Sequence, residues 1–137
     1  MSADEEGTAV EVVIDGAAVD SIAAFYAELN QQLMRGEDWE LGPSLDALND
    51  LLYGGIGALA GAALQRWEIT DHAAMAAALG VETTRKWLLA KLDPEGPFDR
   101  PAIRERLARL EATGHETYFE LLLEVFADHP QVELLLR

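Results

Sequence analysis

Three short runs of apolar and β-branched residues, far apart along the chain, constrain the fold more than any other feature of the sequence. They cover residues 10–14 (Val-Glu-Val-Val-Ile), 63–69 (Ala-Leu-Gln-Arg-Trp-Glu-Ile) and 132–136 (Val-Glu-Leu-Leu-Leu). Such runs are typical of strands, and helical spacing fills the segments between them. Because parallel neighbours need a crossover, and a helix is the usual crossover, the pattern predicts an α/β fold with a small three-stranded parallel sheet packed with helices.

Two helices are expected between the first and second strands. The first follows Asp20 or Ser21, either of which can serve as its N-cap, and its apolar residues have the three-and-four spacing of one buried face: Ile22, Phe25, Tyr26, Leu29 and Leu33. The second covers residues 45–53, with Ser44 as N-cap and Gly54-Gly55 at its end. We expect the first of these helices to pack on the sheet.

After the second strand, Asp71 is expected to cap an alanine-rich helix that ends at Leu79-Gly80, and residues 116–129 form a last helix before the third strand. Between them, residues 82–113 have the pattern of two helical arms joined by a Pro-Glu-Gly-Pro turn. Residues from about 81 to 115 therefore form a helical hairpin inserted into a single domain of residues 1–137, whose acidic start, residues 1–8, is expected to be flexible. The second arm is basic: Arg100, Arg104, Arg106 and Arg109.

Composition excludes several classes of function. The 137 residues have the length of one ordinary domain, and without cysteine there is no disulfide, no thiolate nucleophile and no cysteine zinc site. The first six residues lack the positive charge and apolar stretch of a secretory signal, and no apolar run approaches the roughly 20 residues of a membrane helix. We therefore expect a cytoplasmic protein that does not cross a membrane.

The charge of the chain is strongly acidic. Ten Lys and Arg against 25 Asp and Glu give a formal net charge of −15, which repels nucleic acids and anionic lipid surfaces and attracts basic proteins. A surplus of acidic residues is also explained by solubility alone. The position of the charges is therefore needed to distinguish solubility from the binding of a basic partner.

The short helix at 45–53 has two distinct sides. At 100° per residue its leucines fall on one side, and the opposite stripe is polar: Asp46, Asn49, Asp50 and Tyr53. The helix dipole favours Asp46 in the first turn by about 0.3 to 1 kcal/mol, whereas Asp50 repeats the same charge one turn later. Both a solvated face and a binding face fit this pattern. Trp39, in the loop at 35–43, fits the edge of a core or a contact surface equally well.

No motif points to catalysis, a metal or a cofactor. Gly55, Gly57 and Ala60 have the spacing of a dinucleotide fingerprint, but a helix rather than a strand precedes them, so they are interpreted as a loop. His72, His115 and His129 have no paired spacing that would bind a metal. The sequence therefore favours a binding protein over an enzyme.

Residues 13–16, 39–57 and 122–129, in this order of elements, resemble the barstar-like family of intracellular ribonuclease inhibitors. The segment Leu-Asp-Ala-Leu-Asn-Asp after a glycine-containing loop carries most of the resemblance, and residues of about 81–115 lie outside it. In that family, the loop and the short helix block the basic active site of the nuclease. The resemblance implies that Asp46 and Asp50 are the principal contact carboxylates and that Asp128 is a further one.

This chain departs from the family pattern where the prototype has aromatic residues, because it has Glu40, Leu41 and Asn49 there. We expect Trp39 to be the compensating apolar anchor, with Asn49 and Tyr53 as supporting contacts. The expected function is inhibition of a basic ribonuclease, as a bacterial antitoxin or immunity protein, without a cofactor. The alternative is a non-inhibitory interaction module that uses Trp87 and the arginines of the hairpin to bind an acidic protein.

Overall fold

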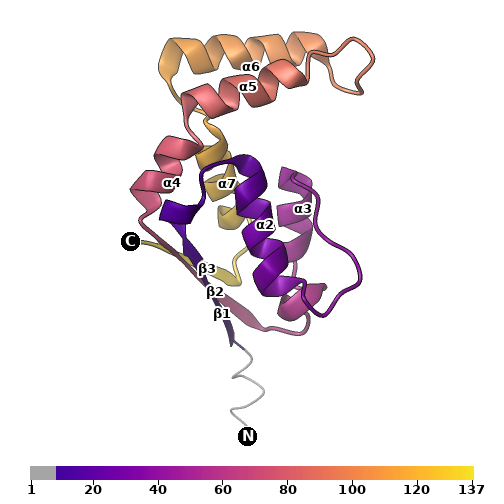
Figure 1. Ribbon diagram of the computed structural model, residues 1–137, viewed down its shortest axis with the longest axis vertical. Helices are drawn as coiled ribbons and strands as arrows, with labels where there is room; N and C mark the ends of the chain where they lie inside the picture. The colour runs from indigo at the N-terminus through magenta and orange to yellow at the C-terminus, as the bar shows by residue number, and fades with distance from the viewer. Residues whose placement is uncertain (1–8) are drawn as a thin grey trace, which may run out of the picture.

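The sheet has three parallel strands with the second strand in the middle. The computed structural model describes residues 9–137, and the flexible start predicted for residues 1–8 lies outside this range. Strand β2 (Leu64–Thr70) pairs in parallel with β1 (Ala9–Asp15) on one side and with β3 (Val132–Leu136) on the other (Figure 1). The predicted three-stranded parallel sheet is confirmed, within one residue at each strand end.

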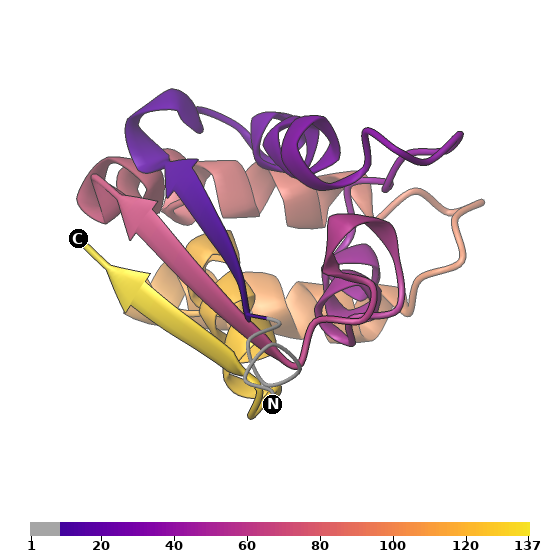
Figure 2. The same ribbon diagram turned by 90° about the horizontal axis from the view of Figure 1, so that it is seen from below.

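The strand register separates an inner and an outer face of the sheet. On the inner face, Val12, Trp67 and Leu134 lie side by side across the three strands. Figure 2 shows that the helices lie to one side of the strands, so this face is covered. On the outer face, Arg66 lies between Glu11 and Glu133 and forms ion pairs with both, at 3.7 and 3.3 Å. The alternation of buried and exposed residues along β1 and β2 follows from this one-sided arrangement.

The predicted helices are present among residues 9–137. After β1 and a 3-10 turn, η1 (Gly16–Ala18), come α2 (Ile22–Leu33), α3 (Leu45–Leu52) and a second 3-10 turn, η2 (Gly57–Leu59). After β2 follow α4 (His72–Ala78), α5 (Val81–Ala90), α6 (Arg100–Thr113) and α7 (Tyr118–Ala127). In the part of the chain that the structure describes, no helix is both long and apolar enough to span a membrane.

Among the helix starts, one choice that the sequence left open is resolved and two differ from prediction. Ser21 rather than Asp20 caps α2, since its hydroxyl accepts a hydrogen bond from Ala24 N. Asp71 occupies the N-cap position of α4, as predicted, but its φ is 47° and its side chain accepts no capping hydrogen bond. The prediction that its side chain caps the helix was therefore wrong. The last helix begins at Tyr118, two residues later than predicted, because Thr117 and Glu120 form a capping box.

The main core fills the space between the sheet and the helices that cover it. Trp67 is buried at its centre, stacks edge-on against Phe126 with ring centroids 5.1 Å apart, and donates from Nε1 to Gln65 Oε1. Leucines of α2, α3 and η2 complete the same cluster. The body, meaning residues 9–80 and 116–137, is organised around this one core.

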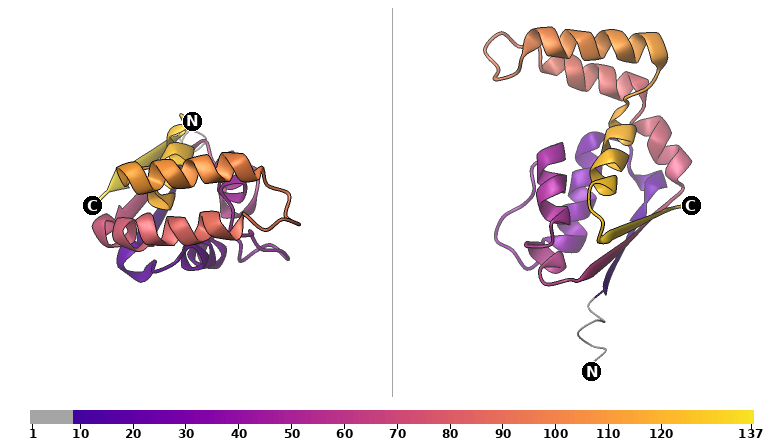
Figure 3. Two further views of the ribbon diagram at one scale, coloured as in Figure 1. Left: turned by 90° about the horizontal axis from the view of Figure 1, so that it is seen from above. Right: turned by 180° about the vertical axis from the view of Figure 1, so that it is seen from behind.

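Helices α5 and α6 form the predicted hairpin, which lies across one end of the body (Figures 1 and 3). Hereafter the hairpin means residues 81–115. Its arms enclose a second, small cluster of buried side chains made by Leu88, Ile103 and Leu110. Trp87 belongs to both clusters, since it packs beside the main core as well.

The hairpin joins the body through two adjacent segments, Leu79–Gly80 and Glu116–Phe119, which we call the neck. Phe119 N donates to Leu79 O at 3.2 Å. The buried Thr84 hydroxyl accepts a hydrogen bond from Tyr118 N and donates one to Gly80 O, both at 2.7 Å. Trp87 adds an edge-on contact to the Tyr118 ring, with centroids 4.9 Å apart. These contacts fix the hairpin to the start of α7.

Candidate protein-binding face

Helix α3 is a short, firmly seated platform. The Ser44 hydroxyl accepts from Ala47 N at 3.1 Å and so caps its first turn. Its inner side is fully buried, with Leu48, Leu51 and Leu52 all at 0% exposure. At its other end, Leu52 O accepts from the side chains of Gln65 and Gln131. The outer side of α3 is therefore held in a fixed place relative to the sheet.

Two of the predicted contact carboxylates lie on this outer side. Asp46, in the first turn, and Asp50, one turn later, are both exposed. Neither forms an ion pair with another residue of 9–137. Their negative charge is thus available to a cationic group from outside.

Asn49 and Tyr53 are tied to the body through a histidine that sequence reasoning did not select. His129, only 4% exposed, donates from Nε2 to Asn49 Oδ1 at 2.8 Å. The Tyr53 ring stands edge-on to the imidazole, with centroids 4.8 Å apart, although the side chain is 71% exposed. The exposed Tyr53 ring is therefore held in place by His129 and remains open to a partner, whereas the Asn49 side chain is bonded within the chain.

The third predicted carboxylate, Asp128, is the neighbour of His129 in the chain. Asp128, the C-cap residue of α7, is exposed and directly precedes His129 in the chain. The hydrogen bond from His129 to Asn49 thereby links the end of α7 to the middle of α3. We call Asp46, Asp50 and Asp128 the acidic face. Its parts come from residues some 80 positions apart, a link that no local spacing reveals.

Trp39 lies in the loop between α2 and α3, at a groove of about 800 Å³ along α2. The Asn30 side chain holds this loop, since its Nδ2 donates to Leu41 O at 3.1 Å and its Oδ1 accepts from Leu41 N at 2.7 Å. Leu41 is consequently turned into the core, whereas Trp39 stays 45% exposed. Trp39 and Asp46 line two different grooves, so Trp39 lies beside the acidic face rather than within it.

A second, smaller groove of about 340 Å³ runs between the start of α3 and the hairpin. Its α3 side includes Leu45 and Asp46, and its hairpin side consists of Trp87, Lys91, Phe98 and Arg106. Pro43 lines both this groove and the one at Trp39. Asp46 therefore stands where the body and the hairpin meet, an adjacency that was not predicted.

The hairpin side of this groove combines aromatic rings with positive charge. Lys91 Nζ lies 4.6 Å from the ring centroid of Trp87 and 4.0 Å from that of Phe98, and the Arg106 guanidinium is 5.5 Å from that of Trp87. Partial burial, and secondly the nearby Arg106, lower the pKa of Lys91, while Asp46 acts in the opposite direction. Trp87, half-buried between Tyr118 and these cations, is thus engaged within the chain.

No protein-family model matches this chain, and no curated protein matches it in sequence. The class of protein is therefore argued from the site. Within residues 9–137, no three His, Asp or Glu side chains are grouped so as to hold a metal ion. The site consists of exposed carboxylates, two exposed aromatic side chains and a groove, on a well-anchored helix and loop, which is an arrangement suited to binding another protein.

Proposed function

We propose that this chain is a barstar-like inhibitor that binds a basic ribonuclease in the bacterial cytoplasm and blocks its active site without turnover and without a cofactor. In this proposal Asp46, Asp50 and Asp128 replace RNA phosphates in the cationic site of the nuclease. Trp39 and Tyr53 contribute apolar contact at either side, and Asn49 supports Tyr53 and Asp128 through His129.

One observation carries the proposal: the three carboxylates of the acidic face are exposed on anchored elements, and none forms an ion pair within residues 9–137. Elsewhere in the chain, glutamates such as Glu11, Glu116 and Glu133 do pair with arginines. A net charge of −15 adds long-range attraction for a basic partner. Charge steering of this kind is known from complexes between a ribonuclease and an acidic inhibitor protein.

The resemblance of residues 39–57 to the barstar-like family gives the proposal its target. The parallel sheet covered on one side by helices is compatible with that family. The loop of residues 35–43 leads directly into α3, and both have residues exposed to solvent. The alternative is an interaction module that works through Trp87 and the arginines of the hairpin. It has less support, because Trp87 packs in part on Tyr118 and Arg109 pairs with Glu116 at 3.0 Å.

The test is a pull-down of ribonucleases from the lysate and secretome of the host, followed by an RNA-cleavage assay of the captured protein. It compares the wild type with an Asp46→Ala/Asp50→Ala double variant. The matched control is Glu11→Ala/Glu133→Ala, which changes the net charge equally but on the outer face of the sheet. Circular dichroism confirms that all three proteins are folded.

We expect the wild type and the control to capture and silence a ribonuclease, and the acidic-face variant to lose at least about 100-fold in affinity. That loss corresponds to about 2.7 kcal/mol, within the range for truncated interface charges. Equal capture by all three proteins would contradict the use of this face. Capture of non-nucleases alone would favour the hairpin module instead.

A further inference from the structure

The groove between α3 and the hairpin places opposite charges side by side. Asp46 faces it from α3, and Lys91 and Arg106 face it from α5 and α6. Neither Lys91 nor Arg106 forms an ion pair within residues 9–137, although acids outnumber bases in the chain by 25 to 10. Two cations held together on aromatic rings, without a salt bridge to any carboxylate of residues 9–137, form a small positive surface beside Asp46.

The distribution of charge along the sequence agrees with this local picture. Residues 81–115 contain seven of the ten Lys and Arg and six of the 25 Asp and Glu, so the hairpin has a formal charge of +1. The rest of the chain has a formal charge of −16. The hairpin is therefore nearly neutral, in contrast to the strongly acidic body that it adjoins.

Apolar groups give the same groove a floor on which a partner can pack. Leu45 lines it from α3, and Trp87 and Phe98 line it from the hairpin. Phe98 is 45% exposed, so its ring offers apolar surface that a partner can reach. A segment that fits here carries a carboxylate for Lys91 and Arg106 and an apolar group for the rings.

We propose that the hairpin is a second contact element of the binding site, and that the partner presents an acidic, apolar segment beside its basic patch, which docks in the groove formed by Leu45, Asp46, Trp87, Lys91, Phe98 and Arg106. The inference rests on the proposed function, because it assigns the hairpin to the same interface. It adds a specificity element: a nuclease with only a basic rim would meet Lys91 and Arg106 as like charges, and would be disfavoured.

This proposal and a purely acidic interface predict opposite results for one substitution. If the partner were basic throughout, Lys91→Gln would remove a repelling charge next to Asp46 and tighten binding. If an acidic segment docks in the groove, the same substitution removes an attractive contact and weakens binding. Lys86→Gln is the matched control, since Lys86 is an exposed residue of the same helix that does not line the groove, and the net charge changes equally.

The experiment measures the dissociation constant of the captured ribonuclease for the wild type, Lys91→Gln, Arg106→Gln, Lys86→Gln and Asp50→Asn. We expect Lys91→Gln and Arg106→Gln each to weaken binding at least about three-fold relative to Lys86→Gln, as for charge contacts at an interface rim. Tighter binding, or no difference from Lys86→Gln, would overturn the inference while a loss in Asp50→Asn still upheld the proposed function. If Asp50→Asn binds like the wild type, the proposed function itself fails.

Photo-cross-linking gives a second measurement that does not depend on binding energies. A benzoylphenylalanine replaces Phe98 in one protein and Leu135, on the outer face of the sheet, in another; the two side chains are equally exposed, at 45%. We expect the ribonuclease to cross-link at position 98 and not at position 135. Inhibition of the ribonuclease without cross-linking at position 98 would place the hairpin outside the interface.

Discussion

The body and the hairpin differ in how each is held together. The body has one large core, in which Trp67 and the leucines of α3 are almost completely buried. The hairpin has only Leu88, Ile103 and Leu110 buried between its arms, with Leu92 and Leu107 partly covered. Hydrophobic stabilisation grows with the apolar area buried. The body therefore buries enough apolar surface to be stable by itself, whereas the hairpin does not.

The difference teaches that the position of the hairpin depends on the neck. Two contacts hold it there: the buried Thr84 hydroxyl bonds to Gly80 O and Tyr118 N, and the half-buried Trp87 ring packs on Tyr118. Tyr118 in turn shares a hydrogen bond of 2.8 Å with Tyr26 of α2, inside the main core. The hairpin is thus an appendage, and Tyr118 is a principal link between it and the main core.

Replacing one buried leucine in each region tests whether the two cores unfold separately, and has the largest expected effect. Leu48→Ala in the body should lower the free energy of unfolding by about 2–5 kcal/mol and reduce protection throughout. Leu110→Ala should fall at the low end of that range, because a small cluster near solvent can collapse around the gap. Urea unfolding gives the energies, and hydrogen exchange should show the Leu110→Ala loss in α5 and α6 alone. Equal loss of protection in the strands would mean that both regions form one cooperative unit.

Thr84→Val sharpens the comparison at the neck, with an intermediate effect. It retains the shape of the side chain but leaves the buried Tyr118 N–H without its acceptor, which should cost about 1–3 kcal/mol. Thr83→Val is the control, because the Thr83 hydroxyl bonds only to Ala78 O at a half-buried position. Thermal unfolding measures both variants, and a Thr83→Val effect as large as that of Thr84→Val would contradict the role given to the buried bond.

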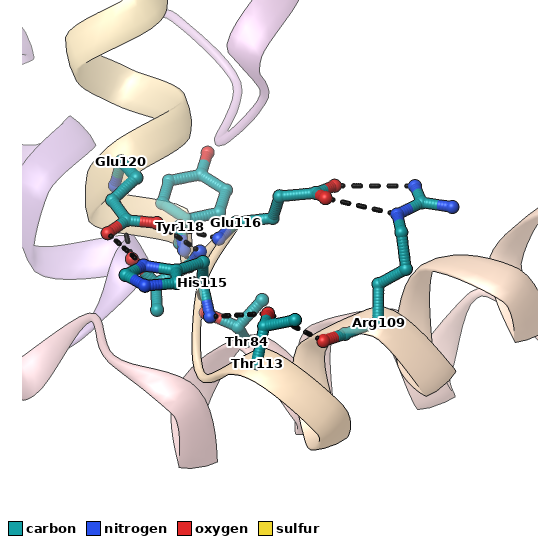
Figure 4. Close-up of polar contacts among 8 residues, drawn as sticks. Thr84, Arg109, Thr113, His115, Glu116, Tyr118 and Glu120 are labelled. Atoms are coloured by element: carbon teal, nitrogen blue, oxygen red, sulfur yellow. Dashed lines mark hydrogen bonds and ion pairs between the residues drawn. The ribbon is translucent and has the colours of Figure 1, made fainter.

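Arg109→Gln should have the smallest effect, because its ion pair with Glu116 is exposed to solvent (Figure 4). The hydrogen bond from Arg109 lowers the pKa of Glu116. The contribution of this pair is therefore present above the ordinary carboxyl pKa and is lost as the pH falls through the lowered value. In Arg109→Gln, we expect the pKa of Glu116, followed by NMR, to rise toward its ordinary range, with a smaller loss of stability than in Thr84→Val.

The sequence predicted most of the architecture because strands and helices leave local patterns. The β-branched run at 10–14 predicts a strand, and the leucine spacing at 45–53 predicts a helix. The three-stranded parallel sheet and the paired arms of the hairpin followed from such patterns. Helix ends were less certain, as at Glu116, which has a φ of 65° and precedes α7 instead of beginning it.

The candidate site was only partly predictable, because its parts meet across long stretches of sequence. The exposure of Asp46 and Asp50 followed from their positions on α3. In contrast, the bond from His129 to Asn49 joins residues 80 positions apart. In the sequence, His129 is only one of three histidines without a paired spacing. The approach of Lys91 and Arg106 to Asp46 depends on how the neck orients the hairpin, which no periodicity encodes.

The clamp that Asn30 places on the loop before α3 affects the thermodynamics of any association at this surface. With both backbone groups of Leu41 bonded to one carboxamide, the loop that carries Trp39 is already ordered in the free protein. A ligand that docks there does not have to immobilise a flexible segment, a step that otherwise costs affinity through lost conformational entropy. Association at the loop is therefore expected to be close to rigid-body docking, with a small entropic penalty and little change in the backbone between the free and bound forms.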